Sequence, residues 1–439
     1  MFGYLEQIVF IIIFSFFGFL IFRRSKTIYR NISLGKKEYK SFNNRSEKIK
    51  NVLLLALGQK KMFKKIIPAI LHLIIYVGFI LINIEVLEII LDGVFGTHRV
   101  FASIFNNSYH YVISFFEFLA ILVIISCVFF LIRRNILKID RFQKVELFGW
   151  PNLDANIILI AEIILMVAIL TMNAADLSLQ SVNSENYTKT GLFIFSNYLT
   201  PMLNGFDESQ LIFIERTAWW VHIVGIFSFA LYVTYSKHLH IFLAFPNTYH
   251  ANNEPLGKMK NMPEITSEIN MMLGVANNTE VQEQTINRFG AKDISDLSWK
   301  NLLDAYSCTE CGRCTEECPA NLTGKKLSPR KIMMDTRDRA EEYGKILDQN
   351  GNPEIKNFLL DSYVTREEIN ACTSCNACTE ACPININPLE IILELRRYVA
   401  LEESKAPNEW NMMFQNIETN FSPWKFPIED RFKWNKENE

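Results

Sequence analysis

The organisation of this 439-residue chain follows from one motif, Cys308-Thr-Glu-Cys311-Gly-Arg-Cys314-Thr-Glu-Glu-Cys318-Pro319. A second copy, Cys372-Thr-Ser-Cys375-Asn-Ala-Cys378-Thr-Glu-Ala-Cys382-Pro383, begins after a gap of 53 residues. Both fit C-x2-C-x2-C-x3-C-P, which is typical of a chain that binds two [4Fe–4S] clusters. Three close thiolates hold three corners of a cubane, and the fourth Cys, before Pro, ligates the other cluster. The spacing therefore predicts two ligand sets: Cys308, Cys311, Cys314 and Cys382, and Cys372, Cys375, Cys378 and Cys318.

Zinc and disulfides are the alternatives for these cysteines. Zinc sites usually take two separated Cys pairs, which does not account for a doubled run of four that ends in Pro. Disulfides are disfavoured if the motifs face the reducing cytoplasm. Eight of the nine cysteines lie in the two motifs, and the ninth, Cys127, is expected to be a small apolar residue.

The sequence around the motifs predicts a mostly helical ferredoxin domain over residues 264–404. The long insert between the motifs, from Pro329 onward, has the pattern of an amphipathic helix, and another helical run covers Leu389–Glu402. Small β-rich ferredoxins place their motifs closer together. Pro255 and Pro263 mark a linker, which we place at residues 246–263.

The N-terminal half has a different composition. Residues 1–243 contain 23 Lys and Arg against 16 Asp and Glu, a net charge of +7, whereas residues 244–439 contain 22 against 31, a net of −9. The whole chain therefore shows no basic signature for nucleic acid. Five apolar runs, each at least 19 residues long, cover residues 4–22, 66–91, 109–132, 155–175 and 217–243.

A helix needs about 20 apolar residues to cross a membrane. Buried helices of a large soluble protein are the alternative, but these rarely stay apolar on all sides for so long. We therefore predict an all-α fold, with a five-span transmembrane bundle over residues 1–245 followed by the helical ferredoxin domain. The first run lacks the positive n-region of a cleaved signal peptide.

The distribution of Lys and Arg predicts the orientation in the membrane. Residues 23–65 carry 14 of them and residues 133–152 carry five, while the alternate connections carry only Arg99, Lys189 and Arg216. By the positive-inside rule, the basic connections are cytoplasmic. This predicts a multi-pass protein of the inner membrane, with its N-terminus outside and its ferredoxin domain in the cytoplasm.

Histidines within the spans are candidate haem ligands, because polar groups in lipid are costly and are often functional. His222 and His240 are 18 residues apart, so on one continuous helix they would share a face about 27 Å apart. This suits axial ligation of two b-type haems, with His72 as the second ligand of the inner haem. His110 is a candidate at the outer haem, whereas His98 and His238 are not expected to be ligands. The alternative is that these histidines bind no metal.

Four glutamates also lie within the spans: Glu85, Glu88, Glu117 and Glu162. Carboxyl groups in lipid could relay protons to or from a quinone. They could equally be neutral, hydrogen-bonded structural groups.

The last residues, 405–439, form a tail rich in aromatic rings: Trp410, Trp424, Trp434, Phe414, Phe421, Phe426 and Phe432. So short a segment cannot bury these rings in a core of its own. The tail either packs back on its own domain or docks on a partner subunit, and docking is favoured because Trp and Phe are enriched at interfaces.

The cysteine motifs resemble those of the iron–sulfur C subunit of heterodisulfide reductases, over roughly residues 260–400. The membrane half is similar to the five-span cytochrome b subunit of respiratory nitrate reductase and to its relative in membrane heterodisulfide reductase. This similarity rests on Val221-His222, Tyr235-Ser-Lys-His-Leu-His240 and Ala244-Phe-Pro-Asn247.

The resemblance implies that His222 ligates the outer haem and His240 the inner haem. In that family the second span carries two ligand histidines ten residues apart. His72 matches the first, but Ile82 stands at the second position. The outer haem's partner is therefore open: it could be His110, or this haem could be five-coordinate or absent.

Together these features predict a membrane-bound electron-transfer subunit. Electrons would pass between a membrane quinone, one or two b-type haems, two [4Fe–4S] clusters and a cytoplasmic redox subunit. That partner would be a cysteine-rich, heterodisulfide-reductase-like protein or a flavoprotein. One alternative is a self-sufficient quinol oxidoreductase, although the sequence carries no nucleotide fingerprint such as G-x-G-x-x-G. The other is a non-catalytic, redox-sensing membrane scaffold.

Overall fold

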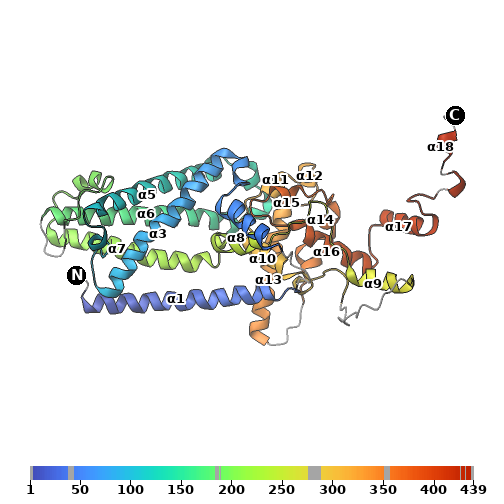
Figure 1. The fold of residues 1–439 in the computed structure, drawn as a ribbon, viewed down its shortest axis with the longest axis horizontal. Helices are drawn as coiled ribbons and strands as arrows, with labels where there is room; N and C mark the ends of the chain where they lie inside the picture. The colour runs from blue at the N-terminus through green and yellow to red at the C-terminus, as the bar shows by residue number, and fades with distance from the viewer. Residues whose placement is uncertain are drawn as a thin grey trace.

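The computed structural model describes residues 3–37, 44–182, 187, 189–274, 288–350, 356–425, 427–430 and 432–436. Within these residues the regular structure is helical, with two isolated β-bridges, Lys36–Ser298 and Leu360–Val364. Figure 1 shows an elongated molecule, in which long helices lie side by side and shorter helices gather at one end. The predicted all-α fold class is confirmed. We call the end of the long helices remote from the short ones the distal end.

Five long helices make up the first half of the chain, and each is long and apolar enough to cross a membrane. They are α1 (Tyr4–Ser33), α3 (Ile66–Phe95), α5 (Tyr109–Leu131), α6 (Trp150–Ser181) and α7 (Glu208–Val233). Two short helices, α2 (Arg45–Asn51) and α4 (Ala102–Phe105), lie in the connections. The prediction of five apolar spans is confirmed.

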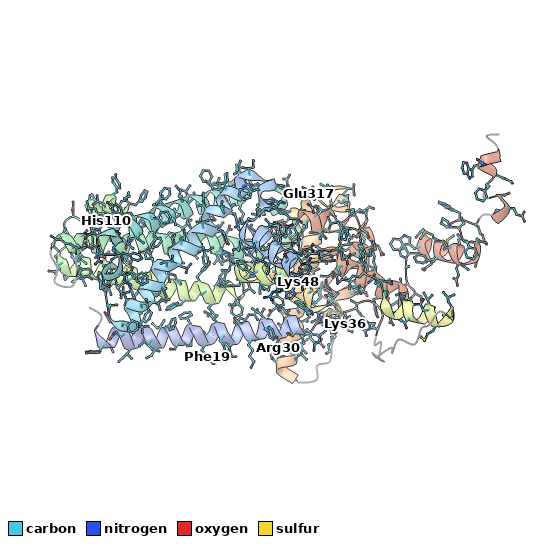
Figure 2. All side chains as sticks on the ribbon, in the orientation of Figure 1. Phe19, Arg30, Lys36, Lys48, His110 and Glu317 are labelled. Atoms are coloured by element: carbon cyan, nitrogen blue, oxygen red, sulfur yellow. The ribbon has the colours of Figure 1, made fainter. Side chains whose placement is uncertain are left out.

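Helix α1 lies at the edge of the bundle. Its apolar stretch is almost entirely exposed, and Phe19 projects from it away from the other helices (Figure 2). Phe10 is its buried anchor: this ring packs against Trp219 with ring centres 5.7 Å apart. Gly93 on α3 makes room for the ring, because a Cβ atom there would lie 2.8 Å from it. Phe14 and Phe17 of α1 also contact Phe227, so this mostly exposed helix is fixed to α7 by a group of aromatic rings.

The fifth long helix, α7, runs from Glu208 to Val233, so it begins and ends earlier than the predicted span 217–243. Ser236 then caps a short 3-10 turn, Lys237–Leu239, its hydroxyl accepting the amide of His238 at 3.1 Å. A new helix, α8 (His240–Tyr249), follows. The expectation that His222 and His240 lie on one continuous helix is therefore wrong, and the 27 Å spacing does not apply.

Helix α8 packs against the second half of the chain. The Asn247 side-chain amide donates to the carbonyl of Ile384 at 3.0 Å, and its oxygen accepts from Lys300 Nζ at 3.0 Å. The first residues of the predicted linker, as far as Tyr249, are therefore helical and in contact with the second domain.

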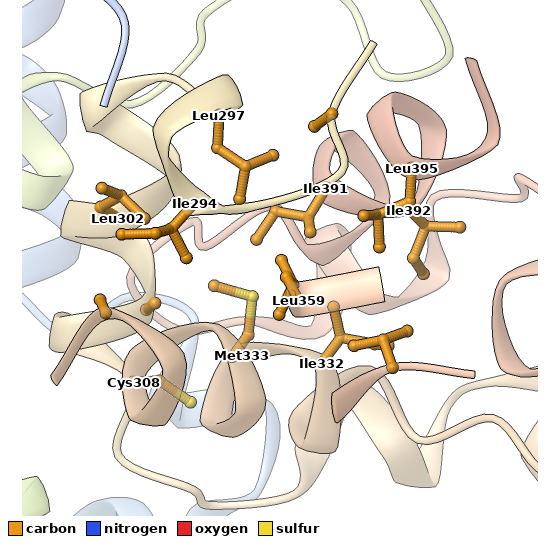
Figure 3. Packing of buried hydrophobic residues seen from close by; sticks show 14 of the residues in the cluster. Ile294, Leu297, Leu302, Cys308, Ile332, Met333, Leu359, Ile391, Ile392 and Leu395 are labelled. Carbon is orange, nitrogen blue, oxygen red and sulfur yellow. The ribbon is translucent and has the colours of Figure 1, made fainter. Parts of the chain in front are cut away.

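The second domain is a cluster of short helices around one apolar core. These are α10 (Trp299–Ser307), α11 (Arg313–Glu316), α12 (Pro319–Leu322), α13 (Pro329–Asn350), α14 (Arg366–Ala371), α15 (Ala377–Ala381) and α16 (Pro388–Leu401), while α9 (Pro263–Met272) contributes no described residue to this core. Figure 3 shows the core, in which Leu302, Ile332, Leu359 and Leu395 converge from separate elements. Reciprocal side-chain caps begin α10 at Ser298 and α14 at Thr365. The short helices α11 and α15 lie within the two cysteine motifs, and each contains the third Cys of its motif.

The membrane bundle and the second domain share this core. Ile28, near the end of α1, is buried among the residues of the second domain. The Arg24 guanidinium forms a bidentate pair with Glu341 on α13, at 2.9 and 2.8 Å, and Asn31 donates to the Tyr306 hydroxyl at 3.0 Å. Basic residues that served above to predict orientation thus also hold the acidic second domain against the bundle.

The aromatic tail extends away from the rest of the molecule as α17 (Asn408–Asn420) and α18 (Lys433–Lys436) (Figure 1). Trp424 is 74% exposed, and Phe414 is also exposed. Trp410 contacts the domain, with the Arg396 guanidinium 5.6 Å from its ring centre. Phe426 lies outside the described residues. Docking of the tail on a partner stays a prediction.

Candidate functional site

The two cysteine loops repeat one backbone conformation. The residues two and four positions after the first Cys have positive φ in both copies: Glu310 (55°), Gly312 (75°), Ser374 (56°) and Asn376 (62°). In each loop the amide two residues on donates to the first sulfur, at 3.5 Å to Cys308 and 3.4 Å to Cys372. The sequence repeat is therefore also a structural repeat, in which backbone amides turn toward sulfur.

The fourth Cys of each motif lies near the other loop. Burial raises the pKa of Cys382 to about 12, and the neighbouring thiols of Cys311 and Cys308 add to the rise. Burial likewise raises the pKa of Cys378 to about 12, with Cys372 and Cys318 as its thiol neighbours. Cys314 is near Cys308, Cys311 and Cys382 of the first predicted ligand set. It is also near Cys378 of the second set, so the two sets are neighbours.

This donor set fits two cubane clusters. Thiols held this close resist ionisation when metal-free, and metal binding releases their protons. Among the described residues, no three His, Cys, Asp or Glu side chains converge as closely as a single metal ion requires. A cubane instead spreads its four thiolates over four irons. Cys375 is exposed, so the second group reaches the protein surface.

His72 and His240 face each other where the bundle meets the second domain. Their ring centres are 6.3 Å apart and the rings are inclined by 41°. His72 Nδ1 lies 3.1 Å from Gln59 Oε1, and His240 Nδ1 lies 3.1 Å from the carbonyl of Lys237. Acceptors at Nδ1 direct Nε2 of each ring toward any metal, as is usual for ligand histidines.

His222 lies near the middle of α7 rather than near its outer end. It is 0% exposed, and its Nδ1 lies 2.9 Å from the carbonyl of Leu165 on α6. Its Nε2 is buried and has no hydrogen-bond partner. Such an orphaned buried nitrogen calls for an explanation, and ligation of a cofactor is one.

The other histidines lie apart from these. Figure 2 shows His110 at the distal end. Leu165, which holds His222, and Leu177, which packs with Tyr109, are about 18 Å apart along α6. The structure therefore does not bring His110 to His222. His238 contacts the His240 ring, with ring centres 5.4 Å apart.

Two residues that sequence reasoning does not single out connect the histidine pair to the first cysteine loop. Lys237, whose carbonyl contacts His240, donates through Nζ to Glu310 Oε2 at 2.6 Å. Burial alone would raise the pKa of Glu310, but Lys237 and Arg337 hold it below its usual value. Arg313, within the motif, donates to the carbonyl of Lys61 at 3.2 Å and lies near Cys311.

The four predicted glutamates separate into two places. Glu85, Glu88 and Glu117 are buried toward the distal end, around the buried Arg99. From the sequence alone, Arg99 is only a charge in a connection between two spans, and its burial is not predicted. Glu162 is buried on α6, one turn from Leu165.

Comparison with known proteins agrees with this arrangement. A family model described as a 4Fe-4S dicluster domain matches residues 307–386. The probable iron-sulfur-binding oxidoreductase FadF of Bacillus subtilis (strain 168) is 27% identical over 98% of this chain and 61% of the relative. The EtfAB:quinone oxidoreductase of Syntrophomonas wolfei is 24% identical over 91% of this chain and 56% of the relative. The chain thus spans about three fifths of the length of these relatives.

A shorter match covers about a third of the chain. One subunit of the dihydromethanophenazine:CoB–CoM heterodisulfide reductase of Methanosarcina mazei is 28% identical over 32% of this chain and 35% of the relative. No solved structure is significantly similar. Residues 307–386 are therefore a 4Fe-4S dicluster domain at the end of a helical membrane protein whose homologues are iron–sulfur oxidoreductases.

Proposed function

We propose that this protein passes electrons between a membrane quinone and a cytoplasmic redox subunit, using b-type haem and two [4Fe–4S] clusters. A membrane-associated electron-transfer role follows from the dicluster domain and the homologues. The observation that carries the finer proposal is the His72–His240 pair, which lies beside the first cysteine loop.

The geometry of this pair suits a bis-histidine haem. Two imidazole nitrogens bonded to one iron at about 2 Å each would place the ring centres roughly 6 Å apart. The observed separation is 6.3 Å, and both rings have Nδ1 engaged by a protein oxygen. His222 would hold a second haem through its orphaned Nε2. The assignment of His110 to this second haem stays a prediction.

The chain's own residues then fix an order of carriers. Lys237 and Arg313 hold the first cysteine loop against the histidine pair. Cys314 lies near Cys378 of the second group, and Cys375 is exposed. Bound haem and clusters would supply the one-electron carriers along this line. The order is quinone, haem, first cluster, second cluster and partner, in either direction.

The partner is proposed from the relatives and from charge. The relative from Syntrophomonas wolfei is named an EtfAB:quinone oxidoreductase, which favours an EtfAB-like protein as the exchange partner here. By the positive-inside rule, the basic connections support a dicluster domain on the cytoplasmic side of the inner membrane. A flavoprotein or a cysteine-rich subunit would meet it near Cys375 and the aromatic tail.

Spectra of the detergent-purified chain test this proposal. Dithionite should produce b-type haem bands, and added quinol should reduce the clusters. His72→Ala and His240→Ala should each remove the same haem, because both rings bind one iron. His98→Ala, at a histidine outside the pair, is the matched control and should keep full haem content. Absence of haem bands in the wild-type chain, or full haem in both pair variants, would contradict the proposal.

A further inference from the structure

The distal end of the bundle contains an unusual number of buried charges. Six carboxyl groups are at most 5% exposed, and they surround two guanidinium groups, those of Arg99 and Arg216. The carboxyls are Glu85, Glu88, Asp92, Glu117, Asp176 and Glu215. Buried carboxylates without matching cations are strongly disfavoured, so part of this group must bind protons or another cation.

Five of the six carboxyls are well supplied with donors. Glu117 accepts from the Phe195 and Ser196 amides, the Ser196 hydroxyl and Asn173. The others, with their partners, are as follows: Glu88 with Tyr109 and Phe101; Asp92 with Thr97, Arg99 and Val100; Asp176 with Arg99 and Gln180; Glu215 with Arg216 and Tyr187. These donors stabilise the ionised forms.

Glu85 differs from the others. It is 2% exposed, and its Oε1 has no hydrogen-bond partner. The groups that face it are the Arg99 guanidinium, the Glu88 and Glu117 carboxyls, and the Asn173 amide, which is its hydrogen-bond donor. A buried carboxylate oxygen without a donor and beside other carboxylates is costly when ionised. Of the six carboxyls, Glu85 is therefore the one that gains most from binding a proton.

Glu85 also lines a small cavity. The cavity measures about 20 Å³ and is lined by Glu85, Glu88, Asp92, His98, Arg99 and Glu215, among others. This volume can hold a water molecule, and the lining offers it several polar partners. The His98 side chain is 18% exposed and lies 3.8 Å from Asp176, so it connects the lining toward the distal surface.

We propose that this distal cavity is a proton-binding site, in which Glu85 carries the proton and exchanges it with the distal aqueous phase through cavity water and past His98. The step is a simple proton transfer: the Glu85 carboxyl gives its proton to water, which passes it outward, and the reverse step reloads the carboxylate. The site needs neither haem nor quinone to bind a proton. It would connect an internal redox reaction to the distal side of the membrane.

Infrared spectroscopy of the full chain in detergent tests the site. A protonated carboxyl gives a C=O stretching band that shifts in deuterated water. We expect this band at neutral pH in the wild type, its loss in Glu85→Gln, and a displaced band in Glu85→Asp. Glu117→Gln is the matched control, because Glu117 is equally buried but has a full set of donors, so no acid band should disappear. Cluster absorbance verifies folding of each variant.

The remaining outcomes are also decisive. His98→Phe should slow the deuterium shift of the band if protons pass His98, and an unchanged rate would overturn that part of the path. An unchanged spectrum in Glu85→Gln would overturn the site. Disappearance of the wild-type band on adding sodium would show that a metal cation, not a proton, balances the charge, and would also overturn the proposal. None of these readouts requires quinone oxidation, so failure here is distinct from failure of the proposed function.

Discussion

Substitution of Glu146 by Gln tests how the dicluster domain is held to the bundle. Arg330 on α13 is 0% exposed and donates to Glu146 Oε1 at 2.7 Å and to the Arg141 carbonyl at 2.8 Å. It also lies against the first cysteine loop, since a Cβ atom on Gly312 would be 2.4 Å from its Nη1. Gln keeps the shape of Glu146 but leaves a buried guanidinium without its counter-charge.

The expected cost can be worked from this geometry. Removing one partner of a buried ion pair costs about 3–5 kcal/mol, and the Gln amide oxygen can still accept one bond, so we expect about 3 kcal/mol. Since about 1.4 kcal/mol is a factor of ten, local opening should become on the order of 100-fold more frequent. Hydrogen exchange of the amides of α11 and of the first turns of α13 should accelerate by that factor.

A pair elsewhere in the same domain provides the control. Lys326 and Glu367 are 2.8 Å apart, but their side chains are 74% and 61% exposed. Solvent screens such a pair, so Glu367→Gln should leave exchange nearly unchanged. Wild-type exchange rates in Glu146→Gln, or equal acceleration in both variants, would refute the assignment of Arg330–Glu146 as a buried clamp.

Three further outcomes are expected. Cys382→Ser should remove about half of the iron and the signal of the first cluster only, and Cys318→Ser that of the second only; loss of the same cluster in both, by electron paramagnetic resonance, would contradict crossed ligation. Arg313→Ala should lower the reduction potential of the first cluster by some tens of millivolts, because a positive charge beside the thiolates favours the reduced state, and Arg313→Lys should restore most of it in a redox titration. Burial alone would raise the pKa of Glu310 and of Glu341, but Lys237 lowers the first and Arg24 lowers the second, so both pKa values lie below normal. These two carboxylates therefore contribute fully to the stability of the junction above their unfolded pKa, about 4.3. Their contribution is lost as the pH falls through the lower pKa of the folded state, so protease sensitivity of the junction should rise only in acid.

The cysteine motifs could be predicted from the sequence because their information is local. Each loop is set by spacing and by residues such as Gly312 and Asn376 that tolerate positive φ. The break after α7 was missed because the predicted span 217–243 was set by its apolar ends, although the polar run Thr234-Tyr-Ser-Lys-His238 lies within it. Ser236 in this run is a helix-capping residue, and its hydroxyl caps the next turn.

The histidine pair shows what sequence can and cannot supply. His72 and His240 are paired by depth in the sequence, and the structure places them together although the supposed continuous helix is broken. The roles of Gln59 and Arg99 could not be predicted, because they arise only from tertiary packing. The glutamates within the spans, together with Arg99 in the connection after the second span, were the sequence signals that pointed toward the distal cavity.

The contacts of α1 also bear on how the chain reaches its folded state. Arg24 and Glu341 are 317 positions apart, and Asn31 and Tyr306 are 275 apart. Helix α1 must therefore stay in the membrane with its last turns unpaired until the chain has been made as far as residue 341. Contacts of such long range form late and slowly. Assembly of the dicluster domain would then act as a late step of biogenesis, in which α1 is joined to segments that are made long after it.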